Sequence, residues 1–321
     1  MAYRGLHIIP HDTRIDFMRY HKVTFAISVI LILGSILLIA FKGLNFGVDF
    51  AGGIRMEVEA KSGEADLTDM RVKLGEAGLG EVSLQRFGDP QFALIRLQHQ
   101  DAAPEASSLA QQRAIAKVEG ILADAYIIRS TEFVGPKVGR EYIENAILAS
   151  VLALLGIMAY VWFRYEWQFA VNCIVALFHD CITTVGLFAL LGIQFDLTTV
   201  AAVLTIAGFS VNDTVVIYDR IREELRRYKK MPLSELLSMS INRTLSRTTM
   251  TSGLAFLAVL ALFLFGGEVL NGFSIAMMWG IIVGTYSTIF VAAPMLVYMN
   301  LRRDRVTGGK PADAEQAPSE A

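Results

Sequence analysis

The residue type best suited to chemistry in this sequence is an acidic side chain inside an apolar segment. Asp213 lies in the stretch LTTVAAVLTIAGFSVNDTVVIYDRIREE, where its neighbours include Gly208, Ser210, Asn212 and Thr214. An ionisable residue within a membrane span costs about 2.5–3.5 kcal/mol on insertion scales, so it is a functional candidate. We interpret Asp213 as a proton carrier; the alternative is an aspartate that only ties helices together by hydrogen bonds.

A basic residue at helical spacing in the next apolar segment supplies a partner for this aspartate. Arg243, Arg247 and Thr251 recur at i, i+4 and i+8, so they share one helix face. Arg247 and Thr251 lie at or inside the predicted membrane edge. The arginine can extend to the interface, as long basic side chains do, or it can pair with Asp213.

His179 and Asp180 fall near the middle of another apolar segment. Neighbours in sequence point in different directions on a helix, so they do not form a chemical pair by their spacing alone. Two interpretations stay open: they bond adjacent helices, or they take part in proton transfer.

Six apolar stretches must position these residues. The chain has 321 residues, 54% hydrophobic and 19% charged, with a mean hydropathy of +0.46. These values exclude a disordered protein, and a net charge of −2 gives no support for nucleic-acid binding. A membrane-spanning helix needs about 20 apolar residues. The stretches that meet this length are Val23–Phe41, Ala146–Phe163, Phe169–Leu191, Leu197–Tyr218, Thr249–Phe265 and Phe273–Met299.

The basic residues in the short loops alternate with each crossing, which predicts the orientation. They occur in the N-terminal arm, after spans two and four, and after span six, whereas Gly192–Asp196 and Gly266–Gly272 contain none. Both termini are therefore expected in the cytoplasm. We divide the chain into an arm over 1–22, a span over 23–41, an outer domain over 42–140, five spans over 141–299 and a partly disordered tail over 300–321.

The outer segment shows the pattern of a small α+β domain. Ile54–Ala60, Glu81–Phe87, Gln91–Leu97 and Tyr126–Val134 read as strands, and Leu67–Ala77 and Leu109–Leu122 read as helices, the first capped by Asp66. The order β-α-β-β-α-β is that of a ferredoxin-like fold. This fold hosts many functions, so it indicates no chemistry by itself.

Two further patterns concern packing. Leucines and isoleucines recur at helical spacing after Pro232, which predicts an amphipathic helix over about 233–246 along the inner membrane surface. Ala276, Gly280 and Gly284 form a stripe of small residues, which favours close helix packing.

Six stretches of the sequence form distinctive motifs: IDFMRYHK at Ile15–Lys22, LNFGVDFAGG at Leu44–Gly53, FVGPKVG at Phe133–Gly139, ALFHD at Ala176–Asp180, SVNDTVVIYDRIRE at Ser210–Glu223 and NRTLSRTTMTS at Asn242–Ser252. Together these motifs resemble the SecF family, the smaller subunit type of the SecDF complex in the resistance-nodulation-division (RND) superfamily. One departure from the family pattern is His21, where we expect an arginine.

The resemblance implies an α-helical membrane protein: the six-transmembrane-helix half of an RND-type transporter with a small periplasmic domain, in the bacterial inner membrane. It implies a non-enzymatic subunit that acts with SecD and uses the proton gradient, without a cofactor or metal, to assist preprotein export. The implied partners are SecD, the SecYEG channel, SecA and unfolded preproteins, with YajC and YidC as further candidates. The proton path maps onto Asp213, Arg247, Thr251 and the adjacent Asn212. A hinge to the outer domain is expected at Gly47, Asp49, Gly52 and Gly53.

Three other functions compete with this interpretation. A solute exporter of the same superfamily shares the layout, but an outer domain this small leaves little room for a solute pocket. An intramembrane aspartyl protease needs two carboxylates about 3 Å apart, whereas Asp213 and Asp219 are about 9 Å apart along one helix. A passive assembly scaffold of the translocon requires no proton coupling, and the sequence leaves it open.

Overall fold

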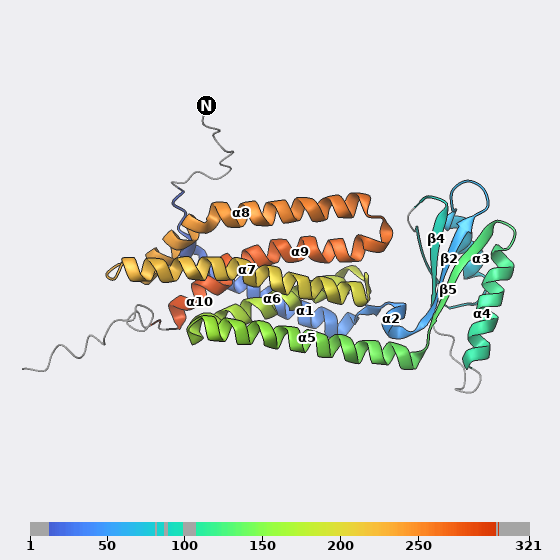
Figure 1. The fold of residues 1–321 in the computed structure, drawn as a ribbon, viewed down its shortest axis with the longest axis horizontal. Helices are drawn as coiled ribbons and strands as arrows, with labels where there is room; N and C mark the ends of the chain where they lie inside the picture. Colours follow the sequence, from blue (N-terminus) through green and yellow to red (C-terminus); the bar gives the residue numbers. More distant parts are fainter. Residues whose placement is uncertain (1–12, 81, 87–88, 99–106, 300, 302–321) are drawn as a thin grey trace, which may run out of the picture.

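The computed structural model describes residues 13–80, 82–86, 89–98, 107–299 and 301. A long helix bundle carries a small sheet domain at one end (Figure 1). In the described part of the chain, six helical segments are long and apolar enough to cross a membrane. The described ends of the chain lie at the end of the bundle opposite to the sheet domain (Figure 1).

The spans are longer than the apolar stretches because polar turns continue several of them. Span two begins at Pro136, ahead of the expected Ala146, and span four runs on to Arg227. The bundle consists of η1 (Phe17–Tyr20), α1 (His21–Lys42), α5 (Pro136–Arg164), α6 (Trp167–Leu191), α7 (Leu197–Arg227), α8 (Leu233–Phe265), η2 (Glu268–Leu270), α9 (Asn271–Ser287), the π-helical turn η3 (Thr288–Ala292) and α10 (Ala293–Tyr298).

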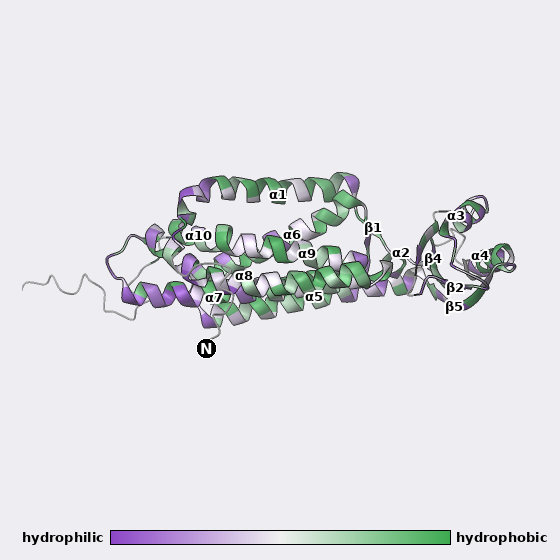
Figure 2. Ribbon diagram, turned by 90° about the horizontal axis from the view of Figure 1, so that it is seen from above, coloured by the Kyte–Doolittle hydropathy of each residue, from purple (hydrophilic) through white to green (hydrophobic). Residues whose placement is uncertain are grey.

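Hydropathy separates the two parts of the molecule. Figure 2 shows hydrophobic residues along the bundle, and hydrophilic residues both at the end of the bundle opposite to the sheet domain and within the sheet domain. Most of α1 and α5 is exposed in the isolated chain, as expected for helices that face lipid. The segment expected to be a disordered tail lies outside the described residues, apart from Leu301.

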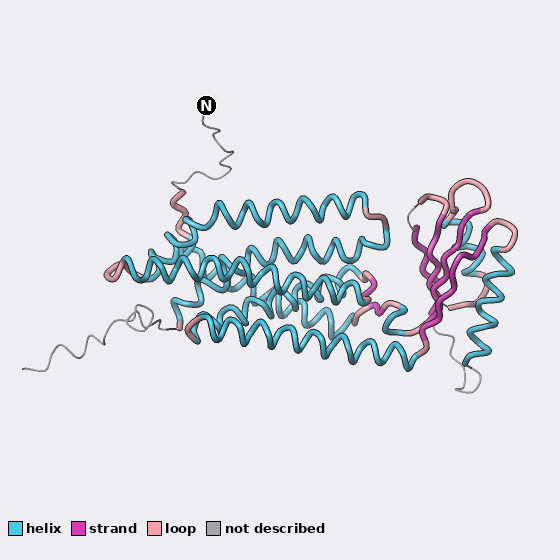
Figure 3. Tube along the Cα trace, viewed as in Figure 1, coloured by secondary structure: helices cyan, strands magenta, loops and turns pink. Residues whose placement is uncertain are grey.

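The sheet domain has the predicted element order (Figure 3). The strands β2 (Gly53–Ala60), β3 (Val82–Arg86), β4 (Phe92–Gln98) and β5 (Tyr126–Val134) form an antiparallel sheet in the order β3-β4-β2-β5. Helices α3 (Leu67–Gly75) and α4 (Ser107–Leu122) cover one face (Figure 1). Alternation in β2 buries Ile54, Met56 and Val58 in the core, and the Asp66 carboxylate accepts hydrogen bonds from the first-turn amides of α3, as predicted.

Small residues let the helices of the bundle approach closely. A Cβ atom added at Gly280 of α9 would lie 2.3 Å from the Ile206 side chain of α7, and one at Gly284 would lie 3.3 Å from Ser210. Helix α1 docks on α6 in the same way, because a Cβ at Gly186 would lie 2.3 Å from Ser35. The small-residue stripe of span six thus packs against α7.

The amphipathic helix predicted over 233–246 exists, but it is not a separate helix along the membrane surface. It forms the first part of α8, which continues unbroken into span five. Leu236, Leu237 and Ile241 are fully buried in the core cluster that also contains Ile221 and Leu225 of α7. The apolar face therefore packs on the C-terminal part of α7 rather than on lipid.

The sheet domain rests on the loop that precedes α7. The linker strand β1 (Asn45–Phe46) pairs in parallel with β6 (Gln194–Phe195) of that loop. After the short helix α2 (Val48–Ala51), the chain enters β2. Arg96 alternates with the core residues of β4, so its side chain leaves the opposite face of the sheet and donates a hydrogen bond to Gln194. Burial lowers the pKa of Arg96, and the charges of Asp196 and Asp49 partly offset this effect.

We predict that Gly280→Val destabilises the bundle by about 1–3 kcal/mol, because overpacking a dense core costs this much. The buried Ile206 has no free space to accept the added methyl groups. Thermal unfolding of the purified protein in detergent measures the effect. Gly156→Val on exposed α5, where nothing lies within 4 Å of an added Cβ, is the matched control. Equal unfolding midpoints for the two variants would contradict the proposed packing.

We predict that Arg96→Met frees the sheet domain from the bundle without unfolding it, because the apolar stem remains and the hydrogen bond to Gln194 is lost. Spin labels on α4 and on the α8–α9 loop should then report a broader distance distribution than in the parent. The control is Arg71→Met, which makes the same change at an exposed position of α3. An unchanged distribution for Arg96→Met would show that β1 and β6 hold the domain alone.

Candidate proton site in the helix bundle

Asp213 lies in the middle of α7, with only 3% of its surface exposed. Its two carboxylate oxygens accept hydrogen bonds from hydroxyl groups of α8. Ser252 Oγ donates to Oδ2 at 3.2 Å, and Thr251 Oγ1 approaches Oδ1 at 3.5 Å. The Ser252 hydroxyl in turn accepts from Thr285 Oγ1 of α9 at 2.9 Å. The carboxylate is therefore bound by a chain of hydroxyls that links three helices.

The other residues predicted for the proton path surround this carboxylate on the exposed side of the bundle. Arg247, Thr251 and Asn212 are all exposed in the isolated chain. Among the residues that the structure describes, Arg247 forms no ion pair with Asp213; its charge acts on the carboxylate from a greater distance. The ion pair between Asp213 and Arg247 that the helical spacing suggested is therefore absent from this structure, although the two residues lie on neighbouring helices.

His179 and Asp180 lie deeper, and both are fully buried. Contrary to the expectation from their spacing, the two side chains do interact: Nδ1 of His179 lies 2.9 Å from Oδ1 of Asp180. Oδ2 accepts hydrogen bonds from Ser210 of α7 at 2.5 Å and from Ser287 of α9 at 2.8 Å. Asp180 thereby connects α6, α7 and α9.

Sequence reasoning missed most of the hydroxyl residues that complete these two clusters. Serine and threonine are common in membrane helices, where they bond neighbouring helices, so their presence alone carries little information. One pattern in the sequence could have been used: Ser28 and Ser35 are polar residues seven positions apart in a mostly apolar span. In the structure they are the only buried residues of α1. The missed residues are Ser28, Ser252, Thr285, Tyr286 and Ser287.

The charged residues after Asp213 in the same motif have a structural role. Glu224, whose side chain is fully buried, pairs with Arg220 at 2.8 Å and also with Arg243 of α8. Asp219 pairs with Arg164 at 3.3 Å and accepts a hydrogen bond from Tyr165 at 2.9 Å. Burial, together with this bond, raises the pKa of the Tyr165 phenol, so it stays a donor. These contacts fix the C-terminal end of α7 to its neighbours.

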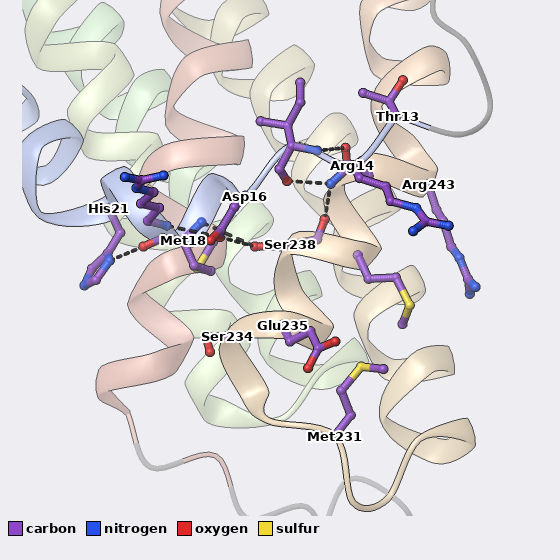
Figure 4. A pocket seen from close by; sticks show the side chains of 14 residues that line it. Thr13, Arg14, Asp16, Met18, His21, Met231, Ser234, Glu235, Ser238 and Arg243 are labelled. Carbon is purple, nitrogen blue, oxygen red and sulfur yellow. Dashed lines mark hydrogen bonds between the residues drawn. The ribbon is translucent and has the colours of Figure 1, made fainter.

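A cavity of about 850 Å³ lies away from Asp213, between the N-terminal arm and the start of α8 (Figure 4). Its walls are held by hydrogen bonds. Asn242 exchanges two hydrogen bonds with the backbone of Ile15, and Ser238 Oγ donates to Asp16 at 3.3 Å. The motif residues here anchor the arm to α8, and we assign this cavity no chemistry.

The glycine-rich linker is packed rather than open. Gly52 and Gly53 have φ of 77° and 143°, which only glycine adopts without strain. A Cβ at Gly53 would also lie 2.2 Å from the carbonyl oxygen of Leu97, and one at Gly47 would lie 3.2 Å from Asp196. Asp49 accepts a hydrogen bond from the Leu197 amide at the start of α7, at 3.4 Å. The hinge remains a prediction.

The chemistry that this arrangement can support is proton binding. A buried carboxylate with hydroxyl partners and a nearby exposed guanidinium can exist with or without its proton as its surroundings change. No group of three or more His, Cys, Asp or Glu side chains gathers into a metal site in the described ranges.

Comparison with known families agrees with the motifs. The family "Protein export membrane protein SecD/SecF, C-terminal" matches residues 115–302, and the "SecD/SecF GG Motif" matches residues 37–64. The second match contains the linker that joins α1 to the sheet domain.

Similar proteins and structures carry the same family name. The protein translocase subunit SecF of Rhodobacter capsulatus is 42% identical over 95% of this chain and 94% of its own length, and that of Rickettsia felis is 44% identical over 93% and 96%. The crystal structure of SecDF from Thermus thermophilus matches 92% of this chain and 40% of that chain, with a TM-score of 0.75 and 35% identity. The two SecF subunits match this chain over nearly their whole length. This chain therefore belongs to the SecD/SecF family of protein export membrane proteins.

Proposed function

We propose that this protein acts with a SecD-type partner in protein export and that proton binding at Asp213 couples export to the proton gradient. The observation that supports the proposal is the position of Asp213: a buried carboxylate directly behind a polar helix face. That face carries Arg247, Thr251 and Asn212, which are exposed in the isolated chain.

Such a face requires a protein partner in the membrane. Lipid offers no hydrogen-bonding groups, and ionisable side chains in spans almost always face protein or a water-filled cavity. The face formed by α7 and α8 is therefore the proposed seam with the second half of the transporter. The name of the SecDF protein of Brucella abortus combines SecD and SecF in a single polypeptide, and this chain matches 41% of its length.

The gradient supplies enough energy for this role. One charge that crosses 100 mV releases about 2.3 kcal/mol. Protonation of Asp213 removes its attraction to Arg247, and deprotonation restores it, which gives the helix pair two states. A few protons per cycle change the equilibrium constant between these two states by orders of magnitude. Because the loop before α7 contacts the periplasmic domain through Asp49 and Gln194, a shift of α7 reaches that domain.

The remaining assignments follow from this role. The protein is a multi-pass membrane protein; we place both termini in the cytoplasm and the sheet domain in the periplasm, as the basic loops indicate. Its proposed further partners are SecYEG, SecA, YajC, YidC and unfolded preproteins. We propose that it is not an enzyme and needs no cofactor beyond the gradient.

We predict that Asp213→Asn abolishes gradient-dependent stimulation of preprotein release while expression and partner binding stay intact. Asparagine keeps the shape, its amide oxygen accepts one hydroxyl hydrogen bond and its amide nitrogen donates to the other hydroxyl, but it binds no exchangeable proton in this range. Arg247→Met, which keeps the apolar stem, should have the same effect. Proteoliposomes that contain the translocon and both subunits, assayed with and without a gradient, measure the stimulation.

The matched control is Asp219→Asn, which changes an exposed aspartate on the same helix and removes one surface ion pair, worth about 0–1 kcal/mol. It should retain full stimulation. Full stimulation in Asp213→Asn across a range of gradients would show that Asp213 only ties helices together, as in a passive scaffold.

We predict that the seam lies at Asn212. A cysteine introduced there, in a chain with Cys173→Ser and Cys181→Ser, should cross-link to the SecD-type partner in native membranes. A cysteine at Leu152, on the exposed face of α5, is the control and should not. Cross-linking from Leu152→Cys alone would place the partner on the other side of the bundle.

A further inference from the structure

The His179–Asp180 pair has the geometry of an acid–base dyad. Nδ1 of the histidine ring lies 2.9 Å from one carboxylate oxygen, and the other oxygen is fixed by Ser210 and Ser287. A histidine whose Nδ1–H is held by a carboxylate presents its other ring nitrogen, Nε2, as a proton acceptor. In triad enzymes the same contact sets the tautomer and the orientation of the ring.

Nε2 of His179 is free to accept a proton. It is buried, and it has no hydrogen-bond partner among the described residues. A buried polar atom without a partner costs about 1–3 kcal/mol and calls for an explanation, such as a functional role or a water molecule. A histidine that only joined helices would be expected to use both nitrogens.

No basic side chain compensates the charge of this dyad. The middles of α1, α6, α7, α9, η3 and α10, which pack around it, contain no lysine or arginine. The titratable groups in these middle parts are Cys173 and Cys181 of α6 itself, Asp213 and Tyr218 of α7, and Tyr286 of α9, with Tyr160 on the neighbouring α5. The ring of Tyr286 contacts the histidine ring, with centroids 6.2 Å apart.

Tyr286 connects the dyad to α1. Its hydroxyl donates to the Thr24 carbonyl oxygen at 2.6 Å and accepts from Ser28 Oγ at 3.1 Å. Directly after Ser287, the helix widens into the π-helical turn η3, and π-helical turns occur frequently at functional sites. A change at His179 thus lies next to the contacts that position α1, the helix that leads into the periplasmic domain.

We propose that His179 is a second proton-binding site of this subunit, separate from Asp213. Nε2 accepts a proton delivered by the gradient through water, which forms the N–H bond and gives an imidazolium ion paired with the Asp180 carboxylate. Loss of the same proton to water returns the neutral ring. Asp180 is the positioning residue of the dyad. This inference rests on the proposed use of the proton gradient.

The direct test is nuclear magnetic resonance of ring nitrogens in the reconstituted complex with its partner. The sequence has five histidines, so the parent spectrum minus the His179→Asn spectrum isolates His179. Asparagine places its amide nitrogen near the position of Nδ1 and keeps the donor to Asp180. We expect the signals to change from the neutral to the imidazolium pattern as the pH is lowered. Signals of one neutral tautomer throughout would overturn the proposal.

The functional test compares preprotein release with and without a gradient. In His179→Asn the ratio of the two rates should fall to unity, whereas Cys181→Ala, on the same helix, should keep the parent ratio. A parent-like ratio in His179→Asn would overturn the proposal. If the parent complex itself shows no gradient dependence, the proposed function is wrong, and the NMR titration alone decides about His179.

Discussion

The structure depends on how an apolar helix bundle accommodates two buried aspartates, Asp180 and Asp213. Lipid and apolar side chains offer no hydrogen bonds, so each carboxylate has to find donors on neighbouring helices. Asp213 finds them on α8 and, through Ser252, on α9; Asp180 finds them on α7 and α9. These bonds cross between helices, and they therefore set the relative positions of the helices that carry the proton site.

This constraint also explains the close packing of α9. Side-chain hydroxyls are short, so they reach a carboxylate on another helix only where the helix axes approach closely. Gly280 and Gly284 allow this approach, since a larger side chain at Gly280 would collide with Ile206. The small-residue stripe and the polar clusters are thus two parts of one arrangement: the first permits the distance at which the second can form.

The same helix that carries Asp213 is fixed at both of its ends. Its C-terminal end is held by Glu224 and Asp219 through ion pairs to α8 and to Arg164. Its N-terminal end begins at the loop on which the sheet domain rests, with contacts from Asp49 and Arg96. The helix is therefore joined to the domain by specific polar contacts and a parallel strand pair, rather than by a free linker.

The six spans, the order of the strands and helices in the outer domain and the choice of Asp213 as a candidate could all be predicted from the sequence. These features are local: periods of 3.6 and 2.0 residues, runs of apolar residues and one charged residue inside an apolar run are all visible along the chain. The partners of the carboxylates became known from the fold alone. Asp180 and Ser287 are far apart in the sequence, as are Arg96 and Gln194, and α8 packs its amphipathic part on α7 instead of lipid. A hydroxyl or an amide has no periodic signature, and its partner is set by where distant helices meet.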